Sequence, residues 1–323
     1  MRVTQKEIAE KMGVSISLVS RVLSGTANDI GIPEKTINGV KETAVSLGYV
    51  PNIAARALKG KSSRVIGVVV YDFKDPFFSE CIAIIQEKLH KAGYSTILVG
   101  FTDRQIDEKD LSSLKQHILD AIIVLGSDLS GAFEKEIKST PIFRIGHSLE
   151  NESSYSFYPE EEHSAQQLAS YLVARKSKDI HLLQADLPNH DLRSFAMKNA
   201  LKAGGIKCQI FKTQNKRYFE SGYDHVSRII KENNTPDIIV CTIDQIALGS
   251  VKALLQKGLA IPEDIGVVGF DNIQMSSHYH PSLTTFHQPI DRVVDKIIQK
   301  ISSNDYKIGK EHFTCPLIQR ASC

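Results

Sequence analysis

A short stretch near the amino terminus carries side chains whose spacing suits contact with DNA. Val19 and Val22 lie three positions apart, so both face one side of a helix over residues 16–23. The opposite side of that helix carries Ile16, Ser17, Ser20 and Arg21. Arginine can donate two hydrogen bonds to guanine, serine can bind a phosphate or a base, and isoleucine can contact the thymine methyl group. The face is a candidate DNA-reading surface; the alternative is an ordinary exposed face of a helical bundle.

Two helices joined by a tight turn would position this face. Thr4 is a predicted N-cap with Glu7 as its capping-box partner, and Gly13 supplies the turn. Ser15 can cap the second helix, and the spacing predicts a helix-turn-helix whose second helix enters the major groove. A third helix is predicted from about residue 33 to residue 47.

A second set of side chains, which could bind a ligand, follows the predicted strands of the larger, carboxyl-terminal part of the chain. These candidates are Asp72, Asp75, Phe77, Phe78, Arg193, Asp244, Asp271 and Gln288. Aromatic faces can stack on a sugar or base ring, and Arg and Asp make charge-assisted hydrogen bonds to hydroxyl groups. For Phe77 and Asp244 a structural role is the favoured alternative, whereas ligand contact is favoured for Arg193 and Asp271.

The elements expected around these residues alternate along the chain. Apolar strands are predicted at 65–71, 94–100, 120–125, 141–146, 179–185, 207–212, 237–241 and 265–270. Helices are predicted between them, including 78–92 and 106–118. This alternation predicts an α/β body of two lobes with doubly wound parallel sheets. Ligands bind such sheets at the strand carboxyl ends, so the cleft between the lobes is the predicted ligand site.

Charge is distributed unevenly between the two parts. Residues 1–63 hold nine Lys or Arg and five Asp or Glu, a net charge of +4, and the rest of the chain has a net charge of −2. A basic amino-terminal unit points weakly to a nucleic-acid partner, and an ordinary solvated surface is the alternative.

Composition excludes several classes of protein. The 323 residues, 42% of them hydrophobic, suffice for about two folded domains. No run approaches the ~18 apolar residues of a transmembrane helix, and the polar start MRVTQKEIAEKMG is not a secretory signal. The scattered cysteines are Cys81, Cys208, Cys241, Cys315 and Cys323. Without a C-x-x-C motif they argue against a disulfide framework and a cysteine zinc site, so a cytoplasmic location is expected.

Signals for catalysis or for a cofactor are weak. The segment His278-Tyr279-His280 has no partner carboxylate nearby, which disfavours a metal site. P-loop, G-x-S-x-G and H-E-x-x-H motifs do not occur. The acidic run 160–162 is interpreted as a solvated helix start. No cofactor and no enzymatic activity are therefore predicted.

Ordered motifs carry a resemblance to a known family. The stretch VTQKEIAEKMGVSISLVSRVLSG, followed by IPEKT, LGYVPNIAARAL and IGVVV, resembles the LacI/GalR family of bacterial transcriptional repressors. The resemblance covers essentially the whole chain. It implies a helix-turn-helix headpiece over 1–48, a hinge helix and linker over 49–63, and a body over 64–323 that binds an effector and dimerises. This body is similar to type I periplasmic sugar-binding proteins, with the first lobe at about 64–159 and 290–310 and the second at about 160–289 and 311–323.

The resemblance also implies roles for single residues. Ile16, Ser17 and Arg21 would read bases. The implied phosphate contacts are Thr4, Ser15, Ser20 and Asn28. In the hinge, a helix that forms on operator DNA would place four residues at the minor groove, namely Asn52, Ala55, Arg56 and Leu58. Leu58 would wedge into the central base step, and the alternative is that it is a core residue of the junction.

Several positions depart from the family pattern. In the headpiece, Leu18 stands where Thr is usual, about three residues are inserted near TANDIGIPE, and Ile37 and Gly39 replace Arg and a helix former. In the body, the usual Gly is Ala196, and the usual Asn before Asp244 is Ile243. The V-x-x-D-N-x-x-G-A segment reads YPEEEHSA, and a usual Gly-His reads Lys-Ser at 176–177. A sugar or sugar derivative remains the default effector, and a nucleobase is the alternative.

The leading hypothesis is a homodimeric regulator whose affinity for a pseudo-palindromic operator is controlled by a small molecule, with no membrane partner. The ending LIQRASC lacks leucine heptads, which disfavours a tail-mediated tetramer. A binding protein for transport or chemotaxis is the runner-up, and residues 1–60 argue against it. A sugar-processing enzyme is the third class, and a catalytic constellation for it cannot be assembled.

Overall fold

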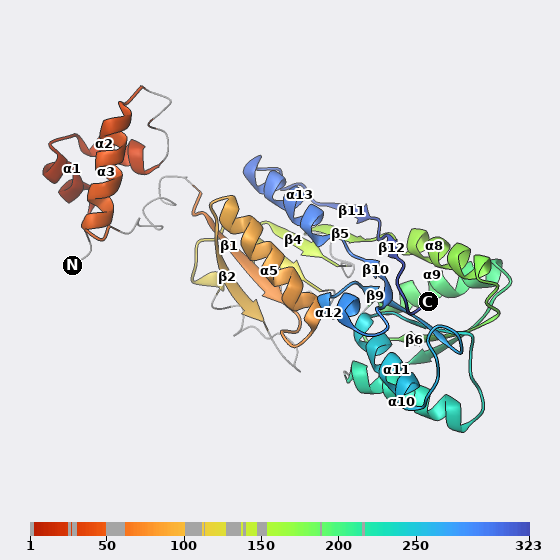
Figure 1. The fold of residues 1–323 in the computed structure, drawn as a ribbon. Helices are drawn as coiled ribbons and strands as arrows, with labels where there is room; N and C mark the ends of the chain where they lie inside the picture. Colours follow the sequence, from red (N-terminus) through yellow and green to blue (C-terminus); the bar gives the residue numbers. More distant parts are fainter. Residues whose placement is uncertain are drawn as a thin grey trace. The chain divides into compact units, whose positions relative to one another are not determined.

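The computed structural model describes residues 3–24, 27, 31–49, 62–100, 112, 114–126, 137, 140–146, 154–187, 189–214 and 217–323. It contains two compact units, Met1–Ser63 and Arg64–Cys323 (Figure 1). Five predicted DNA contacts lie outside the described residues, namely Asn28, Asn52, Ala55, Arg56 and Leu58. The predicted helix at 106–118 also falls largely outside them.

The amino-terminal unit contains the three predicted helices. They are α1 (Gln5–Met12), α2 (Ile16–Leu23) and α3 (Glu34–Ser46). The predicted capping box is present: the Glu7 N–H donates to the Thr4 hydroxyl at 3.4 Å, and the Thr4 N–H donates to the Glu7 carboxylate at 2.6 Å. Gly13 ends α1 with a φ of 63°, in the left-handed region that favours glycine.

The small core of this unit explains two departures from the family pattern. Ile37 is buried among Ile8, Val19 and Val40, so an apolar residue there fills the core. Leu18 is partly buried and packs against the same core. Both changes therefore add apolar packing within the headpiece.

The first lobe of the body is built on a six-stranded parallel sheet. Its strands are β1 (Val65–Val70), β2 (Ser95–Gly100), β3 (Ala121–Leu125), β4 (Ile142–Ile145), β5 (Tyr155–Pro159) and β11 (Gly309–Phe313). The strand order is β11-β5-β4-β3-β1-β2. One face is covered by α5 (Pro76–Lys91) and α13 (Ile290–Ser302), which bury Ile85, Leu89, Val294 and Ile297 against the sheet. The sheet extends to Phe313, three residues beyond the predicted boundary near 310.

The second lobe has its own six-stranded sheet. Its strands are β6 (Asp179–Gln184), β7 (Lys207–Lys212), β8 (Ile238–Cys241), β9 (Gly266–Asp271), β10 (Thr284–His287) and β12 (Leu317–Ile318). The order is β12-β10-β9-β8-β6-β7. The pairs are parallel, as predicted, except that the short β12 runs antiparallel to β10.

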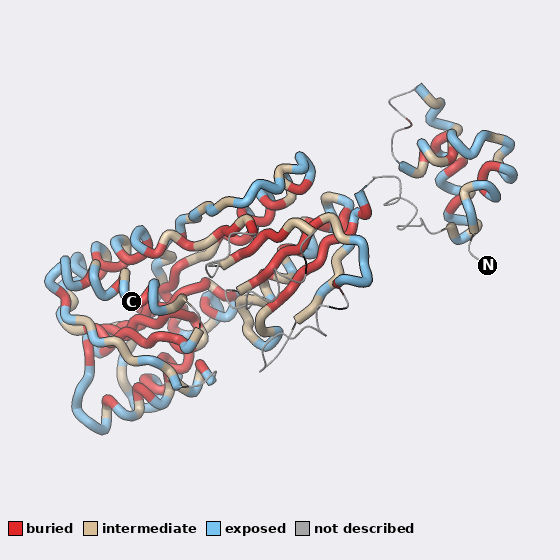
Figure 2. Tube along the Cα trace, turned by 180° about the vertical axis from the view of Figure 1, so that it is seen from behind, coloured by how far each residue is buried: buried red, intermediate tan, exposed pale blue. Residues whose placement is uncertain are grey.

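Helices cover both faces of the second sheet (Figure 1). They are α8 (Glu161–Ala174) and α9 (His190–Ala203) on one face, and α10 (Tyr218–Lys231) and α11 (Asp244–Gln256) on the other. The short α12 (Gln274–His278) follows β9. Figure 2 shows the central strands buried and the outer surfaces of the helices exposed, as expected for a sheet between helical layers. Among the described helices none is long and apolar enough to cross a membrane.

The chain passes between the two lobes three times, as predicted. The crossings lie between β5 and α8, between β10 and α13, and between β11 and β12. The strands predicted from apolar runs are confirmed to within one or two residues. Of the other four, β5, β10 and β11 were not predicted, and β12 falls in the final segment 311–323 that the resemblance assigns to the second lobe.

Candidate DNA-reading helix and ligand cleft

The second helix of the amino-terminal unit separates its apolar and polar residues as predicted. Val19 and Val22 are buried, whereas Ile16 is 49% exposed and Ser17 and Arg21 are also exposed. An exposed isoleucine and an exposed arginine on the same short helix suit contact with base edges.

Two predicted phosphate contacts cap helices. The Ser15 hydroxyl accepts a hydrogen bond from the Leu18 N–H at 3.1 Å, at the amino-terminal end of α2. Thr4 has the same position on α1. The positive end of a helix dipole favours a nearby phosphate, so both positions suit a backbone contact. Ser20 is partly buried on α2.

A cavity of about 90 Å³ lies between the two lobes of the body. Its lining includes six of the predicted cleft residues, namely Asp75, Phe77, Phe78, Arg193, Asp271 and Gln288. Ligand pockets usually have ~300–1,000 Å³, so binding of a sugar-sized ligand requires the lobes to separate. Asp72 and Asp244 are not in the lining.

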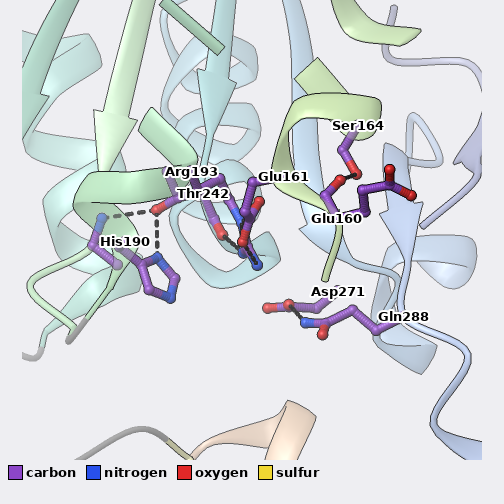
Figure 3. A network of polar contacts seen from close by, with 9 residues as sticks. Glu160, Glu161, Ser164, His190, Arg193, Thr242, Asp271 and Gln288 are labelled. Carbon is purple, nitrogen blue, oxygen red and sulfur yellow. Dashed lines mark hydrogen bonds and ion pairs between the residues drawn. The ribbon is translucent and has the colours of Figure 1, made fainter. Parts of the chain in front are cut away.

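Arg193 is held by a dense polar network (Figure 3). Its Nε and Nη2 donate to the Glu161 carboxylate at 3.0 and 3.1 Å, and its Nη1 donates to the Thr242 carbonyl at 2.9 Å. Its guanidinium also lies 3.5 Å from the centroid of the Phe270 ring. Glu161 is only 6% exposed, so the prediction that the acidic run is a solvated helix start is wrong at this residue.

Asp271 is nearly as buried, at 8% exposure. Its Oδ1 accepts a hydrogen bond from Gln288 Nε2 at 2.7 Å (Figure 3). Burial raises the pKa of Asp271 well above its usual value, and the charges of Asp244 and Asp75 raise it further while Arg193 lowers it. This carboxyl group therefore binds protons more readily than an ordinary aspartate.

Asp75 links the two lobes. Its Oδ1 accepts from the Phe77 N–H at 2.8 Å and caps α5, and its Oδ2 accepts from Gln245 Nε2 of the second lobe at 3.2 Å. Burial raises the pKa of Asp75 to about 6. Phe77 packs against the apolar cores of both lobes, so this end of α5 lies against each of them.

Asp244 serves the structure of the second lobe. Its carboxylate accepts from the Ile273 N–H at 3.0 Å and from the hydroxyls of Ser276 and Thr285, each at 2.6 Å. Burial raises the pKa of Asp244 to about 7. Because these donors occupy a carboxylate outside the cavity lining, we leave Asp244 out of the proposed effector site. Asp72 is left out as well, since it accepts from the Lys74 N–H at 2.9 Å in a turn beside the cavity.

Some lining residues were not predicted. They are Gly126, Ile145, Gly146, Pro159, Glu161, Leu187, Asn189, His190, Ile243 and Phe313. Asn189 has a φ of 65°, and its side-chain Nδ2 is buried without a hydrogen-bond partner among the described groups. Asn189 and His190 follow β6 at the same edge of the sheet at which β9 ends with Asp271. Because ligands bind parallel sheets at the carboxyl ends of the strands, Asn189 and His190 could have been predicted from the sequence.

Metal ligands do not gather in this body. Within the described residues, no group of three or more His, Cys, Asp or Glu could hold a metal ion.

Comparisons with known proteins place relatives along the whole chain. A family model described as a periplasmic binding protein-like domain matches residues 169–323. The chain is 26% identical over 312 residues to the HTH-type transcriptional repressor PurR of Glaesserella parasuis serovar 5, covering 94% of this chain and 91% of the relative. It is 29% identical over 332 residues to the HTH-type transcriptional regulator MalR of Clostridium butyricum, covering 98% of each.

A solved structure is similar over the same extent. A crystal structure of the Lac repressor dimer bound to operator and the anti-inducer ONPF has a TM-score of 0.83 and 24% sequence identity, covering 100% of this chain and 99% of that one. Both the headpiece and the two-lobed body therefore have counterparts in one known fold.

Proposed function

Because this chain belongs to the LacI/GalR family of transcriptional regulators, we propose that it is a sequence-specific DNA-binding repressor controlled by a small molecule. Its relatives are regulators and not enzymes. The observation that carries the proposal is the exposed face of α2 on a correctly capped helix-turn-helix, in a chain that continues into a two-lobed ligand-binding body.

The DNA contacts are proposed for both the headpiece and the hinge. In the headpiece, Ile16, Ser17 and Arg21 read bases, and Thr4, Ser15, Ser20 and Asn28 bind phosphates. In the hinge, Asn52, Ala55, Arg56 and Leu58 occupy the minor groove. Insertion of an apolar side chain there unstacks a base step and bends the DNA, and the additional protein–DNA contacts that bending allows offset the cost of unstacking. Residues 1–48, 49–63 and 64–323 form the headpiece, hinge and body.

A homodimer would read both halves of the operator. The similar Lac repressor structure is that of a dimer bound to its operator. Two copies of α2 related by two-fold symmetry require half-sites with the same symmetry, so the operator is an inverted repeat.

The effector binds between the lobes, in contact with Phe77, Phe78, Arg193, Asp271 and Gln288. A ligand that binds one arrangement of the lobes better than another shifts the population toward it, and the hinge helices form on DNA in only one of them. A sugar or sugar derivative is the starting hypothesis for the effector, since one similar structure is described as a regulator–cellobiose complex.

Selection of binding sites from a random pool of DNA duplexes tests the proposal. The full chain is expected to enrich an inverted repeat, and its half-sites should carry a guanine that Arg21 contacts. A parallel selection with the Arg21→Ala variant is the control, and it should no longer enrich that guanine. Failure to enrich any common sequence, or enrichment of the same site by both proteins, would contradict the proposal.

A further inference from the structure

The cavity between the lobes carries an excess of acidic groups. Its described lining contains the carboxylates of Asp75, Glu161 and Asp271 and a single guanidinium, that of Arg193. The carboxylates come from both lobes, since Asp75 precedes α5 and Asp271 ends β9. A ligand in this cavity therefore meets carboxyl groups on two sides.

The guanidinium of Arg193 is already engaged. It is 5% exposed, forms a bidentate pair with Glu161, donates to the Thr242 carbonyl and stacks on Phe270. Using this guanidinium for an anionic ligand would require breaking a buried bidentate pair, which is strongly unfavourable. Arg193 is thus poorly placed to attract a phosphate or a carboxylate.

Among the described residues, Asp75 and Asp271 form no ion pair, although the charge of Arg193 lowers the pKa of Asp271. Asp271 accepts from Gln288 through Oδ1, and within the described part of the chain no donor reaches its Oδ2. Among the described residues, the hydrogen bonds to the Asp75 side chain come from neutral donors, including the Phe77 N–H and the Gln245 amide. Burial raises the pKa of both groups, and the charge of Asp75 adds to the shift at Asp271. A positive charge placed between them would relieve this repulsion.

The remaining walls suit an organic group rather than a bare ion. The rings of Phe77 and Phe78 lie 5.6 Å apart and line the cavity, together with Leu187. Ile243 stands where the family has an Asn, so a hydroxyl partner is replaced by an apolar surface. The Nδ2 of Asn189, which has no hydrogen-bond partner among the described groups, can donate to a ligand oxygen.

We propose that this cleft selects a small ligand with a protonated amine and at least one acceptor oxygen over neutral and anionic ligands of the same shape. The ammonium donates hydrogen bonds to Asp75 and Asp271, the aromatic rings face the cation, and Asn189 donates to the oxygen. The proposal rests on the proposed function, because it names the effector class of the same cleft.

Two series of probes, each sharing a scaffold and carrying a cationic, a neutral or an anionic group, test the selection. Thermal shifts of the full chain would be measured with glucosamine, glucose and glucose 6-phosphate, and with tyramine, 4-hydroxyphenylethanol and 4-hydroxyphenylacetate. At least one amine is expected to raise the Tm, and its neutral and anionic counterparts should bind at least ten times more weakly. The Asp271→Asn and Asp75→Asn variants should lose this preference, whereas Asp186→Asn, an exposed aspartate outside the cavity lining, should keep it.

Calorimetry at pH 6 gives an independent readout. Because the pKa of each carboxyl group is raised, part of the population is protonated, and a bound cation should release those protons. The heat of binding of the amine should therefore depend on the ionisation enthalpy of the buffer, and this dependence should weaken in Asp271→Asn. A buffer-independent heat would overturn the proposed contact with the carboxyl pair.

The outcomes separate this proposal from the function on which it rests. A larger shift from a neutral or anionic probe than from its amine would overturn the charge selection and leave the cleft as the effector site. If neither amine shifts the Tm, the proposal is overturned as well. Operator selection by the full chain, carried out with and without each amine, judges the regulator function separately.

Discussion

Single side chains show where local sequence is informative and where it is not. The caps at Thr4 and Ser15 and the buried pair Val19 and Val22 were predicted from spacing within one turn or two of helix. The pairing of Glu161 with Arg193 was not, because the partners are 32 positions apart and three consecutive Glu resemble a solvated helix start. The hydrogen bonds to Asp244 could not be predicted for the same reason, since its three donors come from residues 29 to 41 positions later.

A pair of buried histidines in the second lobe forms a chain of hydrogen bonds whose direction can be deduced. Arg228 Nη2 lies 3.0 Å from His225 Nδ1, and His225 Nε2 lies 3.1 Å from His181 Nδ1. Arginine can only donate, so His225 accepts at Nδ1 and donates from Nε2 to His181. Both imidazoles are therefore neutral in this arrangement, and protonation of either would disrupt it.

The histidine pair predicts a loss of stability in acid. Burial lowers the pKa of His225 to about 3, with further lowering by His181 and Arg228. Burial also lowers the pKa of His181, although Asp179 opposes the shift and Lys207 adds to it. A folded-state pKa below the unfolded value gives stability that is present above pH ~6.5 and is lost as the pH falls toward the folded pKa.

The His225→Phe variant should remove this dependence. Between pH 7 and pH 5 we expect the wild type to lose about 2 kcal/mol more of its unfolding free energy than the variant does. Urea unfolding followed by circular dichroism at both pH values measures the difference. His163→Gln, an exposed histidine on α8, is the control and should follow the wild type. Equal pH dependence in wild type and His225→Phe would contradict the assignment.

At the scale of elements, α10 and α11 approach each other through a reciprocal pair of glycines. A Cβ on Gly249 of α11 would overlap the carbonyl group of Phe219, and a Cβ on Gly222 of α10 would overlap the carbonyl group of Ile246. Both obstacles are backbone atoms, which cannot rotate away. The close crossing of the two helices therefore requires glycine at both positions.

The Gly249→Ala substitution should destabilise the second lobe in spite of alanine's higher helix propensity. Propensity favours alanine by only ~1 kcal/mol, whereas overpacking typically costs ~1–3 kcal/mol and more against a rigid backbone. The resulting net loss of unfolding free energy should lower the Tm by several degrees, at ~2–4 °C per kcal/mol. Differential scanning calorimetry measures it, with Lys252→Ala on the exposed face of α11 as the control. An unchanged or higher Tm in Gly249→Ala would show that the helices can separate freely.

The strands divide according to how buried they are. Apolar runs such as Val65–Val70 and Ala121–Leu125 are buried at every position, and they were predicted. Tyr155–Pro159 and Gly309–Phe313 pair with each other at the edge of the first sheet, and both contain polar or partly exposed positions. Strands of this kind give weak hydrophobic patterns, which explains why they were not predicted.

For the whole molecule, the alternation of strands and helices predicted two lobes, and the structure confirms them. The composition of the cavity could not be predicted in the same way. The set of lining residues depends on which strand ends the three chain crossings bring together. It is therefore decided by contacts between distant residues, such as the one between Asp75 and Gln245, which are 170 positions apart. The resemblance to a regulator family supplied the position of the cleft, while the structure supplied its charge.

The central claim is that the exposed face of α2 gives this chain its DNA specificity. The most direct measurement is the Kd of the full chain and of Arg21→Ala for the selected operator and for a scrambled duplex, at one fixed salt concentration. Specific binding typically exceeds non-specific binding by at least ~10³-fold, and loss of a bidentate arginine costs ~1–3 kcal/mol.

We therefore predict a strong preference of the wild type for the operator and, in Arg21→Ala, operator binding weakened by roughly 5- to 150-fold with a smaller change on the scrambled duplex. Lys35→Ala, an exposed residue on α3, should keep the wild-type preference. Equal affinity of the wild type for both duplexes, or an unchanged preference in Arg21→Ala, would contradict the account.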